Sequence, residues 1–337
     1  MKLATYNDGS RDGQLIVVSR DLRSAHCASG AASRLQQVLD DWNFMSPQLE
    51  EISRTLNHGK ARHAFAFEPQ KCMAPLPRAY QLAVGSAYLN HVELAHKAHS
   101  AGMPEMPEMP ESFRAAPQMY RVGSDDFLGP RDAIVWAGTE QGPQHGTDFG
   151  AELAAVTDDV PMGTTPHAAV QRIRLLMLSN AVCQRDLTPA RLPRSLGLAQ
   201  DRPATTFGPV AVTPDELGES WQGGRLHLNM ESTWNGKRVG LCNAGAEMTF
   251  HFGQLIAHLC ETRGVRAGSV VGSGPVSNRD GALGYSCIAD KRASEIIARG
   301  SPKTSFMQLG DTIRIEMKGP DGLSMFGAIE QQVMSLT

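Results

Sequence analysis

The chain has 337 residues, of which 41% are hydrophobic and 20% are charged, and its formal net charge is −3. A chain of this length and composition is long enough to bury a substantial core, either in two structural parts or in one domain with an extension. The small negative charge excludes the basic surface typical of nucleic-acid-binding proteins, so we expect no nucleic-acid partner.

The beginning of the chain predicts a small hairpin followed by helices. The segments Leu3–Tyr6 and Leu15–Ser19 flank a turn-rich stretch and are expected to pair as strands. A helix is predicted over Ala31–Trp42, with apolar residues at three- and four-residue spacing on one face: Leu35, Val38 and Leu39. A second helix is predicted to open at Ser46-Pro47 and to run to Gly59, because a capping serine precedes a first-turn proline.

Further along, a third helix is predicted after His91, and a threefold Met-Pro-Glu repeat follows at Met103–Glu111. Proline at every third position removes backbone donors and favours an extended, solvated loop. We expect an N-terminal domain over residues 1–116 and a C-terminal domain over residues 117–337.

Beyond Pro117 the pattern favours strands, which outnumber helices and do not alternate with them, so the predicted fold class is α+β and strand-rich. An Asn235-Gly236 pair predicts a tight hairpin turn, and the apolar stripe from Phe252 to Leu259 predicts a helix ending near Gly264. The strands expected in this part are Ala133–Ala137, Ala151–Thr157, Leu226–Thr233, Arg238–Cys242, Ser269–Val271, Thr312–Met317 and Ser324–Ile329.

The cysteines and the apolar runs indicate the compartment. Six cysteines are scattered without a C-x-x-C pair, which argues against a zinc ribbon or a disulfide framework and favours a reducing cytosol. No apolar run is long enough to cross a bilayer, and the first residues lack a signal-peptide core. We therefore expect a cytoplasmic protein without a membrane partner.

Several segments together carry a family resemblance, in the order Val84–His91, Asp148–Leu153, Asn180–Arg185, Arg202–Val210 and Gly272–Pro275. They resemble the fumarylacetoacetate hydrolase superfamily over nearly the whole chain. The resemblance implies a small N-terminal α/β domain, a C-terminal domain of mixed, rolled β-sheet, and a homodimer. It also implies a small-molecule carbonyl substrate and a Mg²⁺, Mn²⁺ or Ca²⁺ cofactor that polarises a 1,3-dicarbonyl or a 2-oxo acid.

This sequence departs from the family at its metal ligands. Carboxylates of the family match Val84, Gly150, Glu152 and Ala181, and Glu152 alone is acidic here. Hard divalent cations prefer several oxygen ligands, so these degenerate positions predict that no metal cofactor is bound. The lost side chains are also expected to leave a larger, more apolar cavity. Asp148 lies two residues before Gly150 and offers a substitute ligand, although on a strand it is displaced by roughly 6–7 Å.

Other family positions are altered or retained. Arg202 matches the catalytic lysine but, unlike lysine, does not release its proton in proteins. Pro275 matches a threonine that binds the oxyanion, and it has neither a hydroxyl nor a backbone N–H. The resemblance assigns His91 as the water-activating base, Asp290 as its orienting carboxylate and Arg185 as a substrate contact. The remaining candidate substrate-binding residues are Thr205, Tyr88 and Ser273.

Three functions stay open at this point. The first is a repurposed, metal-independent enzyme of a biosynthetic pathway. It would catalyse cyclisation, tautomerisation, dehydration or C–C cleavage of a β-dicarbonyl, 2-oxo acid or polyketide-like substrate. In it, Arg202 and Arg185 replace the metal's charge while His91 and Asp290 move protons. The second is a metal-dependent acylpyruvate-type hydrolase of aromatic catabolism, with Mg²⁺ or Mn²⁺. The third is a non-catalytic binding protein, in which Arg202 and Glu152 simply pair as buried ions.

Overall fold

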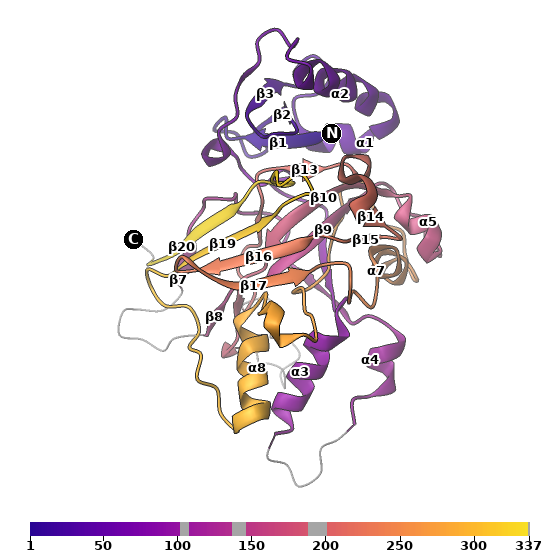
Figure 1. Cartoon of the computed structure of the whole chain (residues 1–337). Helices are drawn as coiled ribbons and strands as arrows, with labels where there is room; N and C mark the ends of the chain where they lie inside the picture. Colours follow the sequence, from indigo (N-terminus) through magenta and orange to yellow (C-terminus); the bar gives the residue numbers. More distant parts are fainter. Residues whose placement is uncertain (102–107, 137–145, 188–200, 336–337) are drawn as a thin grey trace.

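The computed structural model describes residues 1–101, 108–136, 146–187 and 201–335. Most of the Met-Pro-Glu repeat, residues 103–107, lies outside these ranges, as does Ala137 at the end of a predicted strand. The described part is strand-rich α+β, as predicted. Its N-terminal elements form one end of the molecule, and α3 and α8 lie side by side at the opposite end (Figure 1).

The larger sheet of the described part contains strands from the N-terminal segment and from the middle of the chain. Its strands, in spatial order, are β4 (Phe65–Ala66), β3 (Ser24–Cys27), β2 (Gln14–Val18), β1 (Lys2–Tyr6), β13 (Ala211–Val212), β10 (Ile173–Asn180), β9 (Ala151–Thr157), β18 (Val270–Gly272), β5 (Leu82–Gly85) and β6 (Met119–Val122), with β12 (Thr206–Phe207) paired to β10. The predicted hairpin is confirmed, because β1 and β2 pair antiparallel. The step from β1 to β13 makes the N-terminal strands continuous with the rest of the sheet.

A second sheet packs beside the first. Its order is β17 (Lys237–Asn243), β16 (Asn229–Trp234), β19 (Thr312–Met317), β20 (Ile329–Ser335) and β7 (Ile134–Trp136). The hairpin turn at Asn235-Gly236 is confirmed, and both residues have the positive φ that such a turn requires. Two short pairs complete the strands: β8 (Thr147–Asp148) with β11 (Cys183–Gln184), and β14 (Trp221–Gln222) with β15 (Arg225–Leu226).

Alternating side chains on the central strands build a core on each face of the larger sheet. On β10, Leu175 and Met177 pack in the same cluster as Leu35 and Leu39, whereas Leu176 and Leu178 pack with the inner residues of β19. Such two-sided burial explains why β9 and β10 read as continuous apolar runs. The helices of the described part are α1 (Leu35–Asp40), α2 (Trp42–Asn57), α3 (Leu89–His99), α4 (Glu111–Ala115), α5 (Pro166–Val170), α7 (Phe252–Leu259) and α8 (Ile288–Arg299), with 3₁₀ turns η1 (Pro69–Lys71), η3 (Pro214–Ser220) and η4 (Gly281–Leu283).

Four predicted elements had wrong boundaries. The first helix is only α1, and α2 begins at Trp42 with Pro47 inside it rather than at its start. The segment predicted as Leu226–Thr233 is divided between β15 and β16. The last strand is not Ser324–Ile329 but β20, because Gly327 has a φ of 72° that interrupts an extended chain.

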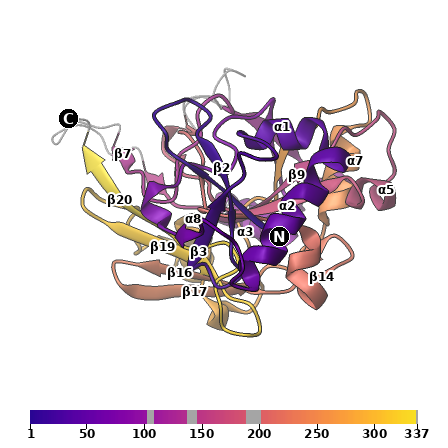
Figure 2. The ribbon, with the colours of Figure 1, turned by 90° about the horizontal axis from the view of Figure 1, so that it is seen from above.

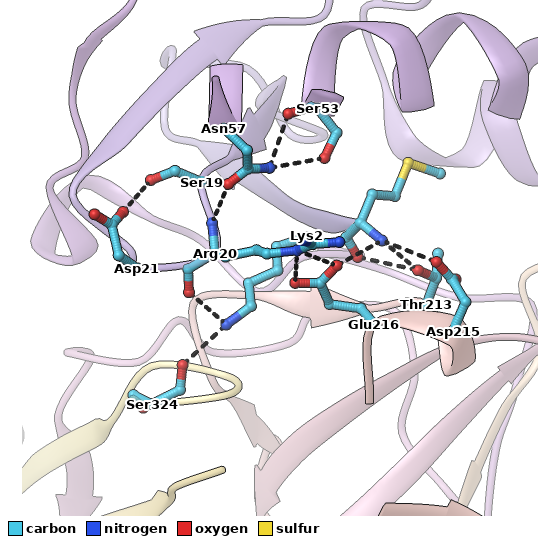
Figure 3. Close-up of polar contacts among 11 residues, drawn as sticks. Lys2, Ser19, Arg20, Asp21, Ser53, Asn57, Thr213, Asp215, Glu216 and Ser324 are labelled. Atoms are coloured by element: carbon cyan, nitrogen blue, oxygen red, sulfur yellow. Dashed lines mark hydrogen bonds and ion pairs between the residues drawn. The ribbon is translucent and has the colours of Figure 1, made fainter. Parts of the chain in front are cut away.

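The N-terminal elements lie over the centre of the strand body when the molecule is viewed from above (Figure 2). The junction beneath them is held by charged groups that have partners (Figure 3). The buried Lys2 Nζ donates hydrogen bonds to the carbonyls of Arg20 and Ser324, at 3.0 and 2.9 Å. Arg20 in turn pairs with Glu216 at 3.0 Å. In the described part of the chain, no helix is long and apolar enough to span a membrane.

Candidate active site

Two parallel strands bring the candidate residues together. β5 and β18 run side by side in the same direction, with Val84 opposite Gly272. Their carboxyl ends therefore meet at one edge of the sheet, where β5 leads into α3 and β18 leads into the loop from Ser273 to Ser277. This topology places His91, on the first turn of α3, beside that loop.

A cavity of about 220 Å³ opens at this edge. Residues from both strand ends line it, together with Tyr120 of β6 and the two arginines expected at the site: His91, Tyr88, Ser273, Tyr120, Arg185 and Arg202. Val84, Gly150 and Ala181 are not among its lining residues. These positions do not border the cavity, and the larger, more apolar cavity expected from the lost carboxylates stays a prediction.

His91 and Asp290 form a hydrogen-bonded dyad. Nδ1 of His91 lies 2.5 Å from Oδ1 of Asp290, which is buried in the first turn of α8. Burial raises the pKa of Asp290, but the neighbouring His91 and the hydroxyl of Ser277 lower it more, so its pKa is below the usual value. The carboxylate is therefore ionised at neutral pH and holds His91 through Nδ1, while the ring contributes to the cavity lining.

Glu152 lies in the middle of the degenerate metal positions. A methyl group built on Gly150 would meet the Ala181 carbonyl at 2.7 Å and Glu152 Oε1 at 3.5 Å. One built on Gly272 would meet Val84 Cγ2 at 3.2 Å and Glu152 Oε2 at 3.5 Å. The Glu152 carboxylate is thus surrounded by closely packed backbone and by a methyl group of Val84.

These surroundings do not fit a hard divalent cation, which needs several oxygen ligands. Glu152 is fully buried, and its Oε1 has no hydrogen-bond partner among the described residues. Burial raises its pKa to about 7, although Arg202, His91 and Arg185 each lower it.

Asp148, the proposed substitute ligand, is engaged elsewhere. Its oxygens accept hydrogen bonds from the backbone N–H groups of Ile288 and Ala289, at 2.6 and 3.1 Å, and so cap α8. The same carboxylate pairs with Arg185 Nε at 3.0 Å. Asp148 is therefore a buried structural anion that also fixes Arg185 at the edge of the cavity.

Arg202 forms no ion pair within 4.0 Å among the described residues. Its guanidinium carbon lies 4.8 Å from the centre of the Tyr120 ring, a cation–π contact. Its Nε has no hydrogen-bond partner, and no ion pair within 4.0 Å joins it to Glu152 in the described part of the chain. The expected Arg202–Glu152 pair is thus not formed, and the guanidinium remains available to an anion.

The other candidate residues have structural contacts. The hydroxyl of Tyr88 donates to the Ala244 carbonyl at 2.7 Å, and Ser273 Oγ donates to the Gly274 carbonyl at 2.7 Å. Both residues line the cavity, but these hydroxyls serve the backbone. Thr205 is buried, is not among the lining residues, and accepts a hydrogen bond from Leu128 through its carbonyl.

One further cluster lies beside the dyad. Cys287 Sγ is 4.0 Å from His91 Nδ1, and the potential ligand atoms of His91, Cys287 and Asp290 all lie within 4.8 Å of one another. In this arrangement Nδ1 and Oδ1 are hydrogen-bonded to each other, and burial raises the pKa of the Cys287 thiol well above its usual value. The cysteine also shares Nδ1 with Asp290, so it is not arranged as a nucleophile activated by the opposite ring nitrogen.

The comparisons with known proteins agree with this architecture. A family model described as fumarylacetoacetate (FAA) hydrolase C-terminal matches residues 81–334, and one described as fumarylacetoacetase N-terminal domain 2 matches residues 1–78. The chain belongs to the fumarylacetoacetate hydrolase family. Family members are mostly enzymes. No curated protein matches the chain.

Solved structures of the family share the fold at low sequence identity. A fumarylacetoacetate hydrolase from Exiguobacterium antarcticum is 16% identical with a TM-score of 0.66, and both chains are covered fully, at 100%. A maleylpyruvate hydrolase from Sphingobium sp. SYK-6, in complex with manganese(II) and pyruvate, is 14% identical with a TM-score of 0.64 and the same 100% coverage of each chain. A probable 2-hydroxyhepta-2,4-diene-1,7-dioate isomerase from Mycobacterium abscessus is 16% identical, with a TM-score of 0.64 and 100% coverage of each chain.

The sequence analysis missed three residues at the site. Tyr120 was not among the predicted site residues, yet it lines the cavity under Arg202, and burial raises its pKa to about 12, so that its phenol stays protonated. It pairs with Val84 across β5 and β6, so the two side chains project to the same face, but this pairing is not visible in the sequence. Ser277 donates a hydrogen bond to Asp290 of the dyad, and Asn90 donates one to Ser277; no sequence pattern indicates either contact.

Proposed function

We propose that this family member is an enzyme that acts without a divalent metal on a small carbonyl substrate, a β-dicarbonyl, 2-oxo acid or polyketide-like compound. The observation that supports this proposal best is the unpaired, largely buried guanidinium of Arg202 in the same cavity as the His91–Asp290 dyad. A fixed positive charge beside a base is what enolisation of a carbonyl compound requires.

The chemical step follows from these groups. The Nε2 lone pair of His91 takes a proton from the carbon next to the carbonyl, and the electron pair of that C–H bond moves to the carbonyl oxygen. Arg202 stabilises the enolate oxygen, and it does so without losing a proton because a guanidinium stays charged in proteins. Arg185, held by Asp148, is placed to bind a second anionic group of the substrate. Return of the proton to another carbon gives tautomerisation, and loss of a β-hydroxyl, which leaves as water with the proton held by His91, gives dehydration. For C–C cleavage, His91 instead takes a proton from water, the hydroxide adds to one carbonyl carbon, and the C–C bond breaks to leave the enolate that Arg202 stabilises.

The experiment follows the proton rather than a particular product. Acetylpyruvate, acetoacetate and 2-oxobutyrate are incubated in D₂O with protein dialysed against EDTA, and exchange of the α-protons is measured by NMR. We expect exchange that survives chelation and falls at least about a hundredfold in His91→Ala and in Arg202→Ala. Matched controls are His258→Ala and Arg20→Ala, whose side chains lie outside the cavity. Loss of exchange on chelation with recovery on adding Mg²⁺ contradicts the proposal.

The main competitor is a metal-dependent C–C hydrolase of the acylpyruvate type. It is favoured by the manganese(II) and pyruvate named for the Sphingobium maleylpyruvate hydrolase. Calorimetric titration of the chain with Mn²⁺ separates the two proposals, since micromolar binding without substrate favours the competitor. A non-catalytic binding role is favoured instead by absent proton exchange in a correctly folded protein.

The proposal keeps the expected assembly and division of the chain. We propose a homodimer in the cytoplasm, with an N-terminal domain over residues 1–116 and a C-terminal domain over residues 117–337. Light scattering of the purified chain gives the subunit number, and limited proteolysis followed by mass spectrometry locates the boundary.

A further inference from the structure

The carboxylate of Asp290 has a second contact on the side away from His91. Ser277 Oγ lies 2.7 Å from Asp290 Oδ2, and Asn90 Nδ2 lies 2.9 Å from Ser277 Oγ. Asn90 Nδ2 is also 2.9 Å from the carbonyl oxygen of Asn278. A chain of side chains thus runs from the α3 residue next to His91, through the loop after β18, to α8.

The direction of each hydrogen bond in this chain is fixed by chemistry. A carbonyl oxygen only accepts, so the end of the Asn90 amide that faces Asn278 must be the NH₂ group. The same NH₂ donates to Ser277 Oγ, which leaves the single hydroxyl proton of Ser277 for Asp290 Oδ2. The ionised carboxylate only accepts, so Nδ1 of His91 must carry the proton in the other hydrogen bond.

We propose that Asn90 and Ser277 are positioning residues, which act through Asp290 to hold His91 as the tautomer with its proton on Nδ1 and its lone pair on Nε2. This inference rests on the proposed function, because Nε2 is the atom assigned to take the substrate proton. The loop that carries Ser277 is itself anchored, since the Asn278 amide bonds to the backbone of Asn243 at 2.8 and 3.1 Å.

Other charged groups also affect the protonation of the His91–Asp290 dyad, and none of them is altered in the variants used for the test. Glu152 faces it from β9, Arg185 and Arg202 face the cavity, and the thiol of Cys287 is next to His91. The negative charge of Asp148 at the start of α8 is matched by Arg185. Since none of these residues forms a hydrogen bond with Ser277 in the described part of the chain, substitution at 277 perturbs Asp290 directly.

The test measures His91 itself by NMR of protein with ¹⁵N-labelled histidine, and His91→Gln identifies its signals. In Ser277→Ala the carboxylate loses a donor, so the dyad binds an extra proton more readily. We expect its titration, and the acidic limb of the kcat/KM profile, to move to higher pH by about one unit. The nitrogen shifts should also show a smaller share of the Nδ1–H tautomer.

Matched variants separate positioning from loss of structure. Ser277→Thr keeps the hydroxyl and should restore the wild-type titration. In Asn90→Asp the new carboxylate accepts the Ser277 proton and turns the hydroxyl away from Asp290, so a larger upward shift is expected. Asn90→Leu leaves the Ser277 hydroxyl free to turn, so it should shift the titration of the dyad by a smaller amount. This variant replaces Ser277→Ala in the test if Ser277→Ala does not fold.

The outcomes distinguish this inference from the proposed function. An unchanged titration and tautomer of His91 in folded Ser277→Ala and Asn90→Asp overturns the positioning role, even if proton exchange is intact. Shifts in the expected order support it, even if none of the carbonyl compounds exchanges with the wild-type protein. In that second case the proposed function fails by itself.

Discussion

Two regions of this molecule bury charged side chains, and they treat those charges differently. At the junction under the N-terminal strands, Lys2 and Glu216 each contact hydrogen-bonding or ionic partners (Figure 3). At the cavity, the Nε of Arg202 and the Oε1 of Glu152 have no hydrogen-bond partner among the described residues. Unpaired buried charge costs stability, so the unpartnered Nε of Arg202, a residue that lines the cavity, indicates a ligand site there rather than a structural role.

The largest expected effect comes from removing the unpaired charge. Arg202→Met should lower kcat/KM for proton exchange by about 10³-fold, because the enolate loses its counter-charge. The melting temperature should stay the same or rise, since no ion pair is broken and an apolar side chain replaces a desolvated cation. Enzyme assays and thermal unfolding of the same preparation check both parts. A clear loss of stability would place Arg202 with the structural charges of the junction.

A paired charge within the site should behave in the opposite way. Asp148→Asn removes the partner of Arg185 and weakens the cap on α8, so we expect destabilisation of about 3–5 kcal/mol in urea unfolding. The control is Glu68→Gln, which breaks an exposed pair with Lys71 and should change stability by less than about 1 kcal/mol. Equal effects in the two variants would mean that burial does not decide the strength of these pairs.

The pKa of Glu152 gives a pH-dependent version of the comparison. Its folded pKa is raised from 4.5 to about 7, so between these values the folded carboxyl keeps a proton that the unfolded one has released. The resulting stability is complete below pH 4.5 and is lost as the pH rises through 7, by about 3 kcal/mol. Glu152→Gln should therefore be more stable than wild type at pH 8 and similar to it at pH 4.5. A difference that does not change with pH would show that Glu152 is ionised throughout.

The sequence predicted the parts of this molecule that follow from residue type and order. The hairpin β1–β2, the turn at Asn235-Gly236 and the buried faces of β9 and β10 came from alternation and turn chemistry. The isolation of Glu152 was also predictable, because the neighbouring family positions carry no oxygen. These features are local or are inherited from the family pattern.

The features that the sequence did not predict depend on contacts between distant segments of the chain. β20 places Gln331 inward, where its side chain bonds to Asn180 and to the Asp132 carbonyl, so the strand lacks a simple apolar alternation. The Asn90–Ser277 contact joins residues 187 positions apart. The Arg202–Glu152 pair, considered for a non-catalytic protein, is not formed among the described residues, and the guanidinium lies over Tyr120 of β6 instead. None of these contacts follows from spacing along the chain.

The smallest effect at neutral pH is expected at the junction. Lys2→Met is the matched counterpart of Arg202→Met, but here two carbonyl oxygens, those of Arg20 and Ser324, lose their donor. We expect destabilisation of about 1 kcal/mol, measured by urea unfolding at pH 7. The sign is opposite to that for Arg202→Met, and this contrast is the sharpest form of the comparison.

The deficit of Lys2→Met should also grow as the pH is raised. Burial lowers the pKa of Lys2 from 10.5 to about 8, so between these values the unfolded lysine holds a proton that the folded one has released. Wild-type stability therefore rises with pH across that window relative to the variant, which has no titrating group at this position. The difference between the two proteins isolates Lys2 from all other groups that titrate there. A constant difference from pH 7.5 to 10 would mean that Lys2 keeps its ordinary proton affinity, so that its partners fully offset the cost of burying its charge.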